Sequence, residues 1–239
     1  MPDRQQLFGT YAVAERTERH VRVNFVSSAD GAVTFSGHSG GLGGETDRAL
    51  LHVLRAMADV LVVGAGTVRA EGYGGLGMSE ADVAWRRSHG LGDAPRLAVV
   101  SNRLDLAPDH EVFHRADGRT LVLTHDAVPG EQVAALAEVA DVVSCGSERV
   151  DLGVAVAKLE ALGLHQILSE GGPHLFGSML EADLVDEACL TISPRFVAGG
   201  AARIAASGAQ LDRRFTPHAV FTDDEGFLFI RYLRDRSQP

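Results

Sequence analysis

Short apolar runs that alternate with amphipathic segments organise most of this chain. Several runs are apolar almost without interruption, as expected for parallel strands that are covered on both faces. Strands are predicted at residues 21–26, 59–64, 96–101, 120–124, 141–144, 166–169 and 186–192, with a short return strand at 32–35. Two more runs, 218–222 and 226–233, are joined by three acidic residues and a glycine, which predicts a hairpin.

Apolar residues at helical spacing fill the intervals between these runs. They predict helices around residues 50–57, 79–88, 131–138 and 151–162, and another from Pro173 onward. Asp151 suits an N-cap and Gly163 suits the position just after a helix end. The alternation predicts an α/β protein with an open, mostly parallel sheet, helices on both faces and an antiparallel C-terminal hairpin. We expect one domain over residues 1–239, with a core at about 21–234 and a polar lead at 1–20.

The stretch 166–180 combines a strand, a tight turn and a helix start. Pro173 suits the first helical position, while Gly171 and Gly172 carry no side chain that would keep a ligand from the backbone. Because a helix start has unpaired N–H groups and partial positive charge, the turn predicts a phosphate site with Glu170 at its edge. An ordinary strand-to-helix corner would use the same residues.

A second turn of this kind follows the strand at 59–64. Gly64, Gly66 and Thr67 stand where the next helix begins, and the Thr67 hydroxyl can cap that helix or bind a phosphate oxygen. The turn is neither a P-loop nor a Rossmann fingerprint, because no Gly-Lys-Ser/Thr follows and Arg69 takes the place of the third glycine.

Polar residues at the end of the strand 96–101 indicate a further contact. Ser101 and Arg103 together offer the hydroxyl and the guanidinium that a ribose 2′-phosphate would require. A polar turn would use the same residue types. The glycine-rich segment 36–44 is likewise either a flexible connection or backbone that approaches a ligand.

Composition narrows the classes of function. The net charge of −10 argues against nucleic-acid binding, which rests on many cations that face phosphate. No apolar run approaches the roughly 20 residues of a membrane span, and the first residues lack the apolar core of a signal peptide, so a cytoplasmic protein is expected. Lys158 is the only lysine and lies on the polar side of a helical pattern, which disfavours Schiff-base chemistry.

No metal site is predicted. The chain has two cysteines, too few for a disulfide framework, and its ten histidines form none of the usual zinc-ligand spacings. An anionic ligand in so acidic a protein would need a local positive site. Arg48, His52 and Arg55 share one line of a predicted helix, although a solvated helix face has the same pattern.

Taken in order, the motifs resemble one family. S-x-D-G, S-G-x-S, L-L-x-x-L-R, G-x-G-T-V, V-V-S and S-E-G-G-P-x-L are similar to the reductase domain of the bifunctional riboflavin biosynthesis deaminase/reductase, over about residues 21–233. The resemblance implies a dihydrofolate-reductase-like fold, NADPH, a homodimer, and hydride transfer that reduces the ribosyl side chain of 5-amino-6-ribosylaminopyrimidinedione 5′-phosphate to the ribityl form. The zinc deaminase motif is absent, so we expect a stand-alone reductase.

The resemblance and the turn chemistry together assign site residues. The cofactor is expected to contact Val26, Gly64, Gly66, Thr67, Ser101, Arg103, Gly171, Gly172, Pro173, His174, Leu175 and Phe176. The substrate is expected to contact Asn24, Asp30, Ser39, Arg55 and Glu170. Glu71 stands where the family has an active-site aspartate, and either Glu170 or Glu71 would orient or supply the proton. Each carboxylate could instead bond only to nearby backbone.

Two departures from the family pattern leave the substrate open. Asn24 stands where these reductases often have a lysine that faces the substrate, and Met78 replaces the last arginine of the motif that begins at Thr67. Arg69 or Arg48 could compensate. One alternative is therefore a reductase of dihydrofolate or another pterin, and a second is a non-catalytic NADPH-binding or sensor protein. The segment 72–93 is expected to form a flap or an oligomer contact.

Overall fold

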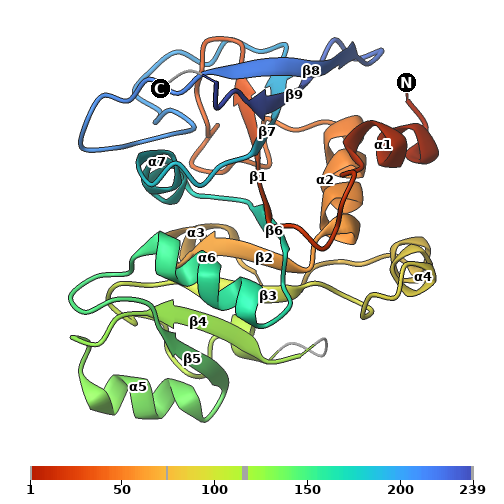
Figure 1. Ribbon diagram of the computed structural model, residues 1–239. Helices are drawn as coiled ribbons and strands as arrows, with labels where there is room; N and C mark the ends of the chain where they lie inside the picture. The colour runs from red at the N-terminus through yellow and green to blue at the C-terminus, as the bar shows by residue number, and fades with distance from the viewer. Residues whose placement is uncertain (1, 74, 115–117, 238–239) are drawn as a thin grey trace.

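The computed structural model describes residues 2–73, 75–114 and 118–237. Within them, nine strands form one sheet in the order β5-β4-β3-β2-β6-β1-β7-β9-β8. Neighbouring strands pair in parallel, except that β9 is antiparallel to both β7 and β8 (Figure 1). The predicted α/β class and the C-terminal hairpin are confirmed.

The elements follow one another along the chain as predicted, except for one added helix at the N-terminus and the absence of the strand expected at 32–35. The strands are β1 His20–Ser28, β2 Val60–Gly64, β3 Arg96–Val100, β4 Thr120–Thr124, β5 Ala140–Ser144, β6 Gln166–Ser169, β7 Glu187–Ser193, β8 Phe215–Thr222 and β9 Leu228–Arg234. The helices are α1 Arg4–Tyr11, α2 Glu45–Met57, α3 Ala65–Glu71, α4 Glu80–Ser88, α5 Gly130–Ala137, α6 Leu152–Ala161 and α7 Pro173–Glu181, with a 3₁₀ turn at Glu111–Phe113.

Both faces of the sheet are covered. Alternate residues of β2 enter different cores: Leu61 and Val63 pack with α1, α2 and α3, whereas Val60 and Val62 pack with α6 and α7. This explains why the β2 sequence is apolar without alternation. No helix in the described ranges is long and apolar enough to cross a membrane.

The local signals at α6 and α7 are confirmed. The Asp151 side chain accepts a hydrogen bond from the Val154 N–H at 3.0 Å as the N-cap of α6, and Gly163 follows that helix with φ of +77°. Pro173 is the first residue of α7, directly after the predicted strand and turn.

The predicted return strand at 32–35 is wrong. Residues 32–34 form no strand, and Phe35 makes only an isolated bridge with His38. The backbone of this segment pairs elsewhere: after a turn closed by the Ser28 N–H and the Ala32 carbonyl at 2.9 Å, the Val33 N–H donates to the Ala202 carbonyl at 3.3 Å. The segment instead runs into the glycine-rich loop that precedes α2.

The N-terminal lead is partly helical, which the sequence pattern did not predict. Helix α1 buries Leu7 and Tyr11 in the core, and Phe8 stacks on Trp85 of α4 with ring centroids 4.5 Å apart. Helix α4 confirms the helix expected at 79–88 and packs on α1 and α2. Gly74, in the segment that precedes it, lies outside the described residues.

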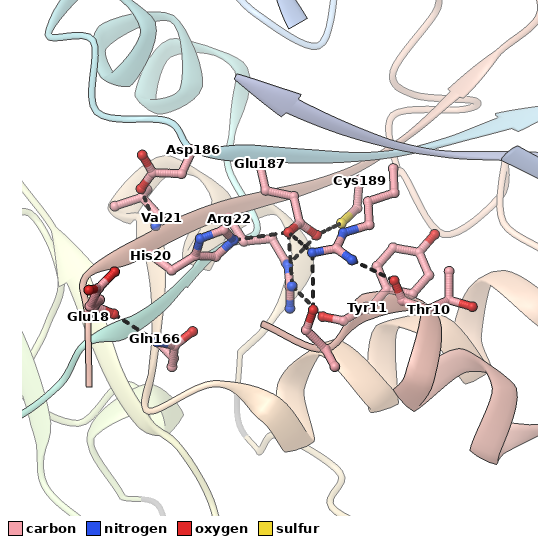
Figure 2. Close-up of polar contacts among 12 residues, drawn as sticks. Thr10, Tyr11, Glu18, His20, Val21, Arg22, Gln166, Asp186, Glu187 and Cys189 are labelled. Atoms are coloured by element: carbon pink, nitrogen blue, oxygen red, sulfur yellow. Dashed lines mark hydrogen bonds and ion pairs between the residues drawn. The ribbon is translucent and has the colours of Figure 1, made fainter. Parts of the chain in front are cut away.

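A buried ion cluster holds the end of α1 against the sheet (Figure 2). Glu187 on β7 has no exposed side-chain surface and accepts hydrogen bonds from Arg22 at 2.7 Å and Arg231 at 2.8 Å, and it lies 3.0 Å from the His20 ring. The same arginines donate to the backbone carbonyls of Tyr11 and Thr10 at 2.6 Å each. These carbonyls close the last turn of α1, so the cluster supplies the partners that a helix end lacks.

Candidate active site

A cleft of about 750 Å³ opens at the carboxyl ends of β1, β2 and β6. Ligands of open parallel sheets bind at this edge, where the loops that follow the strands meet. Most residues predicted for cofactor and substrate line the cleft: Asn24, Val26, Ser39, Arg55, Gly64, Gly66, Thr67, Glu71, Glu170, Gly172, Pro173, His174 and Leu175. The structure thus brings both predicted glycine turns to one cavity.

The two glycine turns touch each other. The Gly64 N–H donates to the Gly171 carbonyl at 2.8 Å, which joins the start of α3 to the turn before α7. A Cβ at Gly172 would lie 2.8 Å from the Thr67 hydroxyl oxygen, so only glycine fits there beside this side chain. Two helix starts with small residues therefore form one wall, the glycine cradle, and the unpaired N–H groups of a helix start favour an anion.

Glu170 is the centre of a hydrogen-bonded group on the adjoining wall. Arg55 on α2 donates to its two carboxylate oxygens at 2.6 and 2.7 Å, and the Tyr73 hydroxyl donates to one of them at 2.9 Å. Arg55 also donates to the Leu76 carbonyl at 2.9 Å. This bidentate pair fixes the carboxylate next to the glycine cradle.

Burial and charge keep the protons of this group in place. Burial by itself would lower the pKa of Arg55, but the Glu170 carboxylate outweighs it and the pKa is raised. Burial, together with the same negative charge, raises the pKa of the Tyr73 hydroxyl well above its ordinary value. Arg55 therefore stays charged and Tyr73 stays protonated, so both act as donors to Glu170.

Glu71 has a more open environment. One of its oxygens accepts a hydrogen bond from the Ser39 backbone N–H at 3.1 Å, and the other lies 3.8 Å from the His38 ring. Its side chain is 25% exposed, against 6% for Glu170. Glu71 is thus the carboxylate of the pair that solvent or a ligand can reach.

Five predicted site residues do not line the cleft. They are Asp30, Ser101, Arg103, Gly171 and Phe176. Asp30 instead fastens a loop: hydrogen bonds from the Ser28 hydroxyl and from the Ala198 and Val197 N–H groups lower its pKa to about 2.

The other four have identifiable places near the cleft. The Ser101 hydroxyl is buried and accepts from the Leu104 N–H at 3.0 Å, and Arg103 follows it in the loop after β3. Gly171, with φ of +91°, completes the turn before α7, and the Phe176 ring stacks on Phe25, which lines the cleft. Their proposed contacts with a cofactor stay predictions.

The structure also shows cleft residues that sequence reasoning missed. Tyr73 and Asp47 both line the cavity, and neither was assigned a role from the sequence. Tyr73 lies in the segment that departs from the family pattern, which was the available signal. Met78, which replaces the expected arginine, packs against the core, and Arg69 pairs with Asp105 at 2.7 Å. Arg48 remains as the cation that lines the cleft beside Arg55.

Comparison with known proteins places the chain in a family. The model of the RibD C-terminal domain matches residues 19–229. The chain belongs to this family. A RibD-family relative from Methanothermobacter thermautotrophicus, a 2,5-diamino-6-ribosylamino-4(3H)-pyrimidinone 5′-phosphate reductase, is 32% identical over 193 residues, which cover 81% of this chain and 86% of the relative. The corresponding reductase of Archaeoglobus fulgidus is 28% identical, over 87% and 95% of the two chains.

Solved structures agree with this assignment. A pyrimidine reductase-like protein from Corynebacterium diphtheriae superposes with a TM-score of 0.85 at 27% identity, over 98% of each chain. The riboflavin biosynthesis reductase Rib7 of Saccharomyces cerevisiae, at 18% identity and a TM-score of 0.67, shares the fold over 97% of each chain. The expected dihydrofolate-reductase-like fold is confirmed, and the protein is an oxidoreductase of the RibD C-terminal domain family.

Proposed function

We propose that this protein is an NADPH-dependent reductase that converts the ribosyl side chain of a ribosylaminopyrimidine 5′-phosphate to the ribityl form. The observation that carries the proposal is the junction at 170–172, where the Arg55–Glu170 pair adjoins the glycine cradle inside one cleft. Such a junction suits a reaction that needs a nucleotide and a polar substrate side by side. The family membership of the chain supports the same reaction class.

The identity of the pyrimidine ring is the first detail of the proposal. The resemblance in sequence pointed to the 2,4-dione, whereas the archaeal relatives are named for a ring with an amino group at position 2. The proposal covers both rings of this ribosylaminopyrimidine class, and kinetics with the two substrates distinguish them.

The cofactor would be held by the two helix starts. Gly66 and Thr67 on one side and Gly172 and His174 on the other would offer backbone N–H groups and a hydroxyl to phosphates, beside the bare backbone of Gly64. When bound, NADPH supplies the hydride that reduces the ribosyl carbon C1 of the opened imine.

The remaining cleft residues would hold the substrate. Arg48 is exposed and lines the cavity, so its guanidinium is available for the 5′-phosphate. Arg55 is already committed to Glu170, and the pair acts as a fixed polar surface against which the ribosyl hydroxyls can be oriented. Ser39 and Asn24 extend this surface along the loop before α2 and along β1.

Proton transfer is assigned to Glu71. Both oxygens of Glu170 are occupied by the Arg55 guanidinium, so neither faces the substrate nitrogen without a partner. Glu71 has one oxygen without such a partner and faces the cleft. That oxygen would hold the proton that the ribosyl nitrogen takes up as C1 is reduced.

The direct test is turnover by the purified protein. NADPH and the ribosylaminopyrimidine phosphate should give loss of NADPH absorbance and a product heavier by two hydrogens, localised by mass spectrometry to the sugar chain. Binding of NADPH without oxidation by any pyrimidine or pterin would replace this proposal with the sensor alternative. Arg103→Ala should weaken NADPH and leave NADH unchanged if Ser101 and Arg103 hold the 2′-phosphate.

A homodimer and a cytoplasmic location complete the proposal. Strand β8 lies at the edge of the sheet, and its Val220 side chain is 58% exposed, so the hairpin offers an edge that a second copy can cover. Light scattering after size exclusion measures the assembly, and a monomer across the working concentration range would contradict it.

A further inference from the structure

Helix α2 presents one row of side chains to the cleft. Asp47, Leu51 and Arg55 lie at i, i+4 and i+8, and all three line the cavity. At 1.5 Å per residue the two charged ends are separated by about 12 Å along the helix axis. Arg55 is committed to Glu170, whereas Asp47, at the other end, has no role in the site described so far.

The Asp47 carboxylate lacks the donors that bind the other buried carboxylates. Among the described residues, its hydrogen-bond partner is the Thr191 hydroxyl. Burial raises its pKa, while the Thr191 hydroxyl beside it and the Arg48 charge lower the pKa in part. A Cβ at Gly43 would lie 2.5 Å from one Asp47 oxygen, so the loop before α2 covers this carboxylate closely.

On strand β1, beside α2, a buried polar atom lacks a hydrogen-bond partner among the described residues. This atom is the Asn24 amide oxygen. Asn24 and Thr191 lie on paired strands, two residues apart in register, on the sheet face that α2 covers. Because buried polar atoms in native proteins are nearly always paired, this corner is an incomplete network that is rich in acceptors.

We propose that Asp47 binds the 2-amino and N3–H edge of a 2-amino-4-oxopyrimidine ring and thereby selects that ring over a pyrimidine-2,4-dione. The inference rests on the proposed function, because it names which ring of that substrate class the cleft takes. A 2-amino-4-oxopyrimidine offers two adjacent N–H donors, which match the two oxygens of a carboxylate. The dione places an oxygen at position 2, where it would face the carboxylate oxygens instead of donating a hydrogen bond to them.

Kinetics with two matched substrates test the selection. The ribosylaminopyrimidine 5′-phosphates with an amino or an oxo group at position 2 are compared by kcat/KM, with dihydrofolate as a third substrate that carries the same 2-amino edge. Wild type should prefer the 2-amino pyrimidine over the dione by at least about tenfold. Asp47→Asn should lower that ratio about tenfold, because an amide offers one acceptor and one donor. Glu45→Gln, an exposed acid in the same turn of α2, should keep it.

The outcomes separate the inference from the proposed function. Equal kcat/KM for the two pyrimidines in wild type, or an unchanged ratio in Asp47→Asn, overturns the inference and leaves the reductase in place. Turnover of dihydrofolate in place of both pyrimidines, lost in Asp47→Asn, supports the edge recognition and identifies the source as a pterin.

A binding measurement decides the case without turnover. Calorimetry compares 2,5,6-triaminopyrimidin-4-one with 5,6-diaminouracil, two rings that differ only at position 2. Preferential binding of the triamino ring that disappears in both Asp47→Asn and Asp47→Ser supports the inference, even where no substrate is reduced. Equal affinity, or no binding of either ring, overturns it. Thermal unfolding of each variant confirms that it is folded.

Discussion

Glu187 and Glu170 are both bound by arginine, and their surroundings differ. Glu187 is enclosed in the core, where it accepts from two arginines and lies beside a histidine, and it has no exposed surface. Glu170 binds one arginine and one tyrosine at the edge of the cleft. The same chemistry thus closes a network in one place and leaves a polar surface open to a ligand in the other. A carboxylate that protein encloses on every side forms a structural ion pair, whereas one that borders a cavity can act on a ligand.

Replacement of Glu187 should give the largest loss of stability. Glu187→Gln leaves two buried guanidinium groups without their counter-charge, so the free energy of unfolding should fall by about 3–5 kcal/mol. Urea unfolding followed by the fluorescence of Trp85, which stacks on α1, measures it. Activity well below the unfolding midpoint should stay close to wild type. Asp93→Asn, in the exposed Arg87 pair, is the matched control and should leave stability unchanged.

Replacement of Glu170 should affect activity more than stability. Glu170→Gln removes the bidentate partner of Arg55 and loosens the surface that orients the substrate, so kcat/KM should fall about 100-fold. Stability should fall less than in Glu187→Gln, because Arg55 can reach water in the cleft. Arg55→Lys, which keeps the charge without the fork, should reproduce much of the defect. A Glu170 variant that unfolds readily yet retains full kcat/KM would remove the distinction between the two carboxylates.

Low pH should remove the contribution of Glu187 to the free energy of unfolding. Burial would raise the pKa of this carboxyl, but Arg22 and the hydrogen bonds from His20, Arg22 and Arg231 hold it well below its ordinary value of 4.5. A lowered folded-state pKa stabilises the fold above the unfolded value and loses that effect as pH falls toward the folded value. The stability gap between wild type and Glu187→Gln should be constant from about pH 7 to about pH 5 and should narrow below about pH 4.5. A gap that stays constant down to about pH 3 would contradict the ion-pair assignment.

The smallest effect is expected at Tyr73. Tyr73→Phe removes one hydrogen bond to Glu170 while Arg55 still holds both oxygens, so kcat/KM should fall by about two- to tenfold. Steady-state kinetics beside the Glu170→Gln variant give the comparison. A loss as large as that of Glu170→Gln would show that the hydroxyl, rather than the arginine, positions the carboxylate.

The sequence by itself determined the local elements and the turns. Periodicity located β4 and β6 to the residue, Pro173 marked the start of α7, and Asp151 marked the cap of α6, because these features depend on neighbours within one helical turn or one strand. The ordered motifs also indicated the family and the fold that comparison confirmed. The cleft residues that sequence reasoning proposed at the two glycine turns lie together for the same reason, since each turn directly follows a parallel strand.

Only the tertiary structure decided which side chains meet. Insertion of β6 between β2 and β1 brings Glu170 to Arg55, 115 positions away, and the pairing of β1 with β7 brings Glu187 to Arg22, 165 positions away. The same pairing also placed Asp47 beside Thr191 in the cleft, although no motif marks either residue. Short-range pattern carries no information on these contacts, because they depend on the order of strands in the sheet rather than on spacing along the chain.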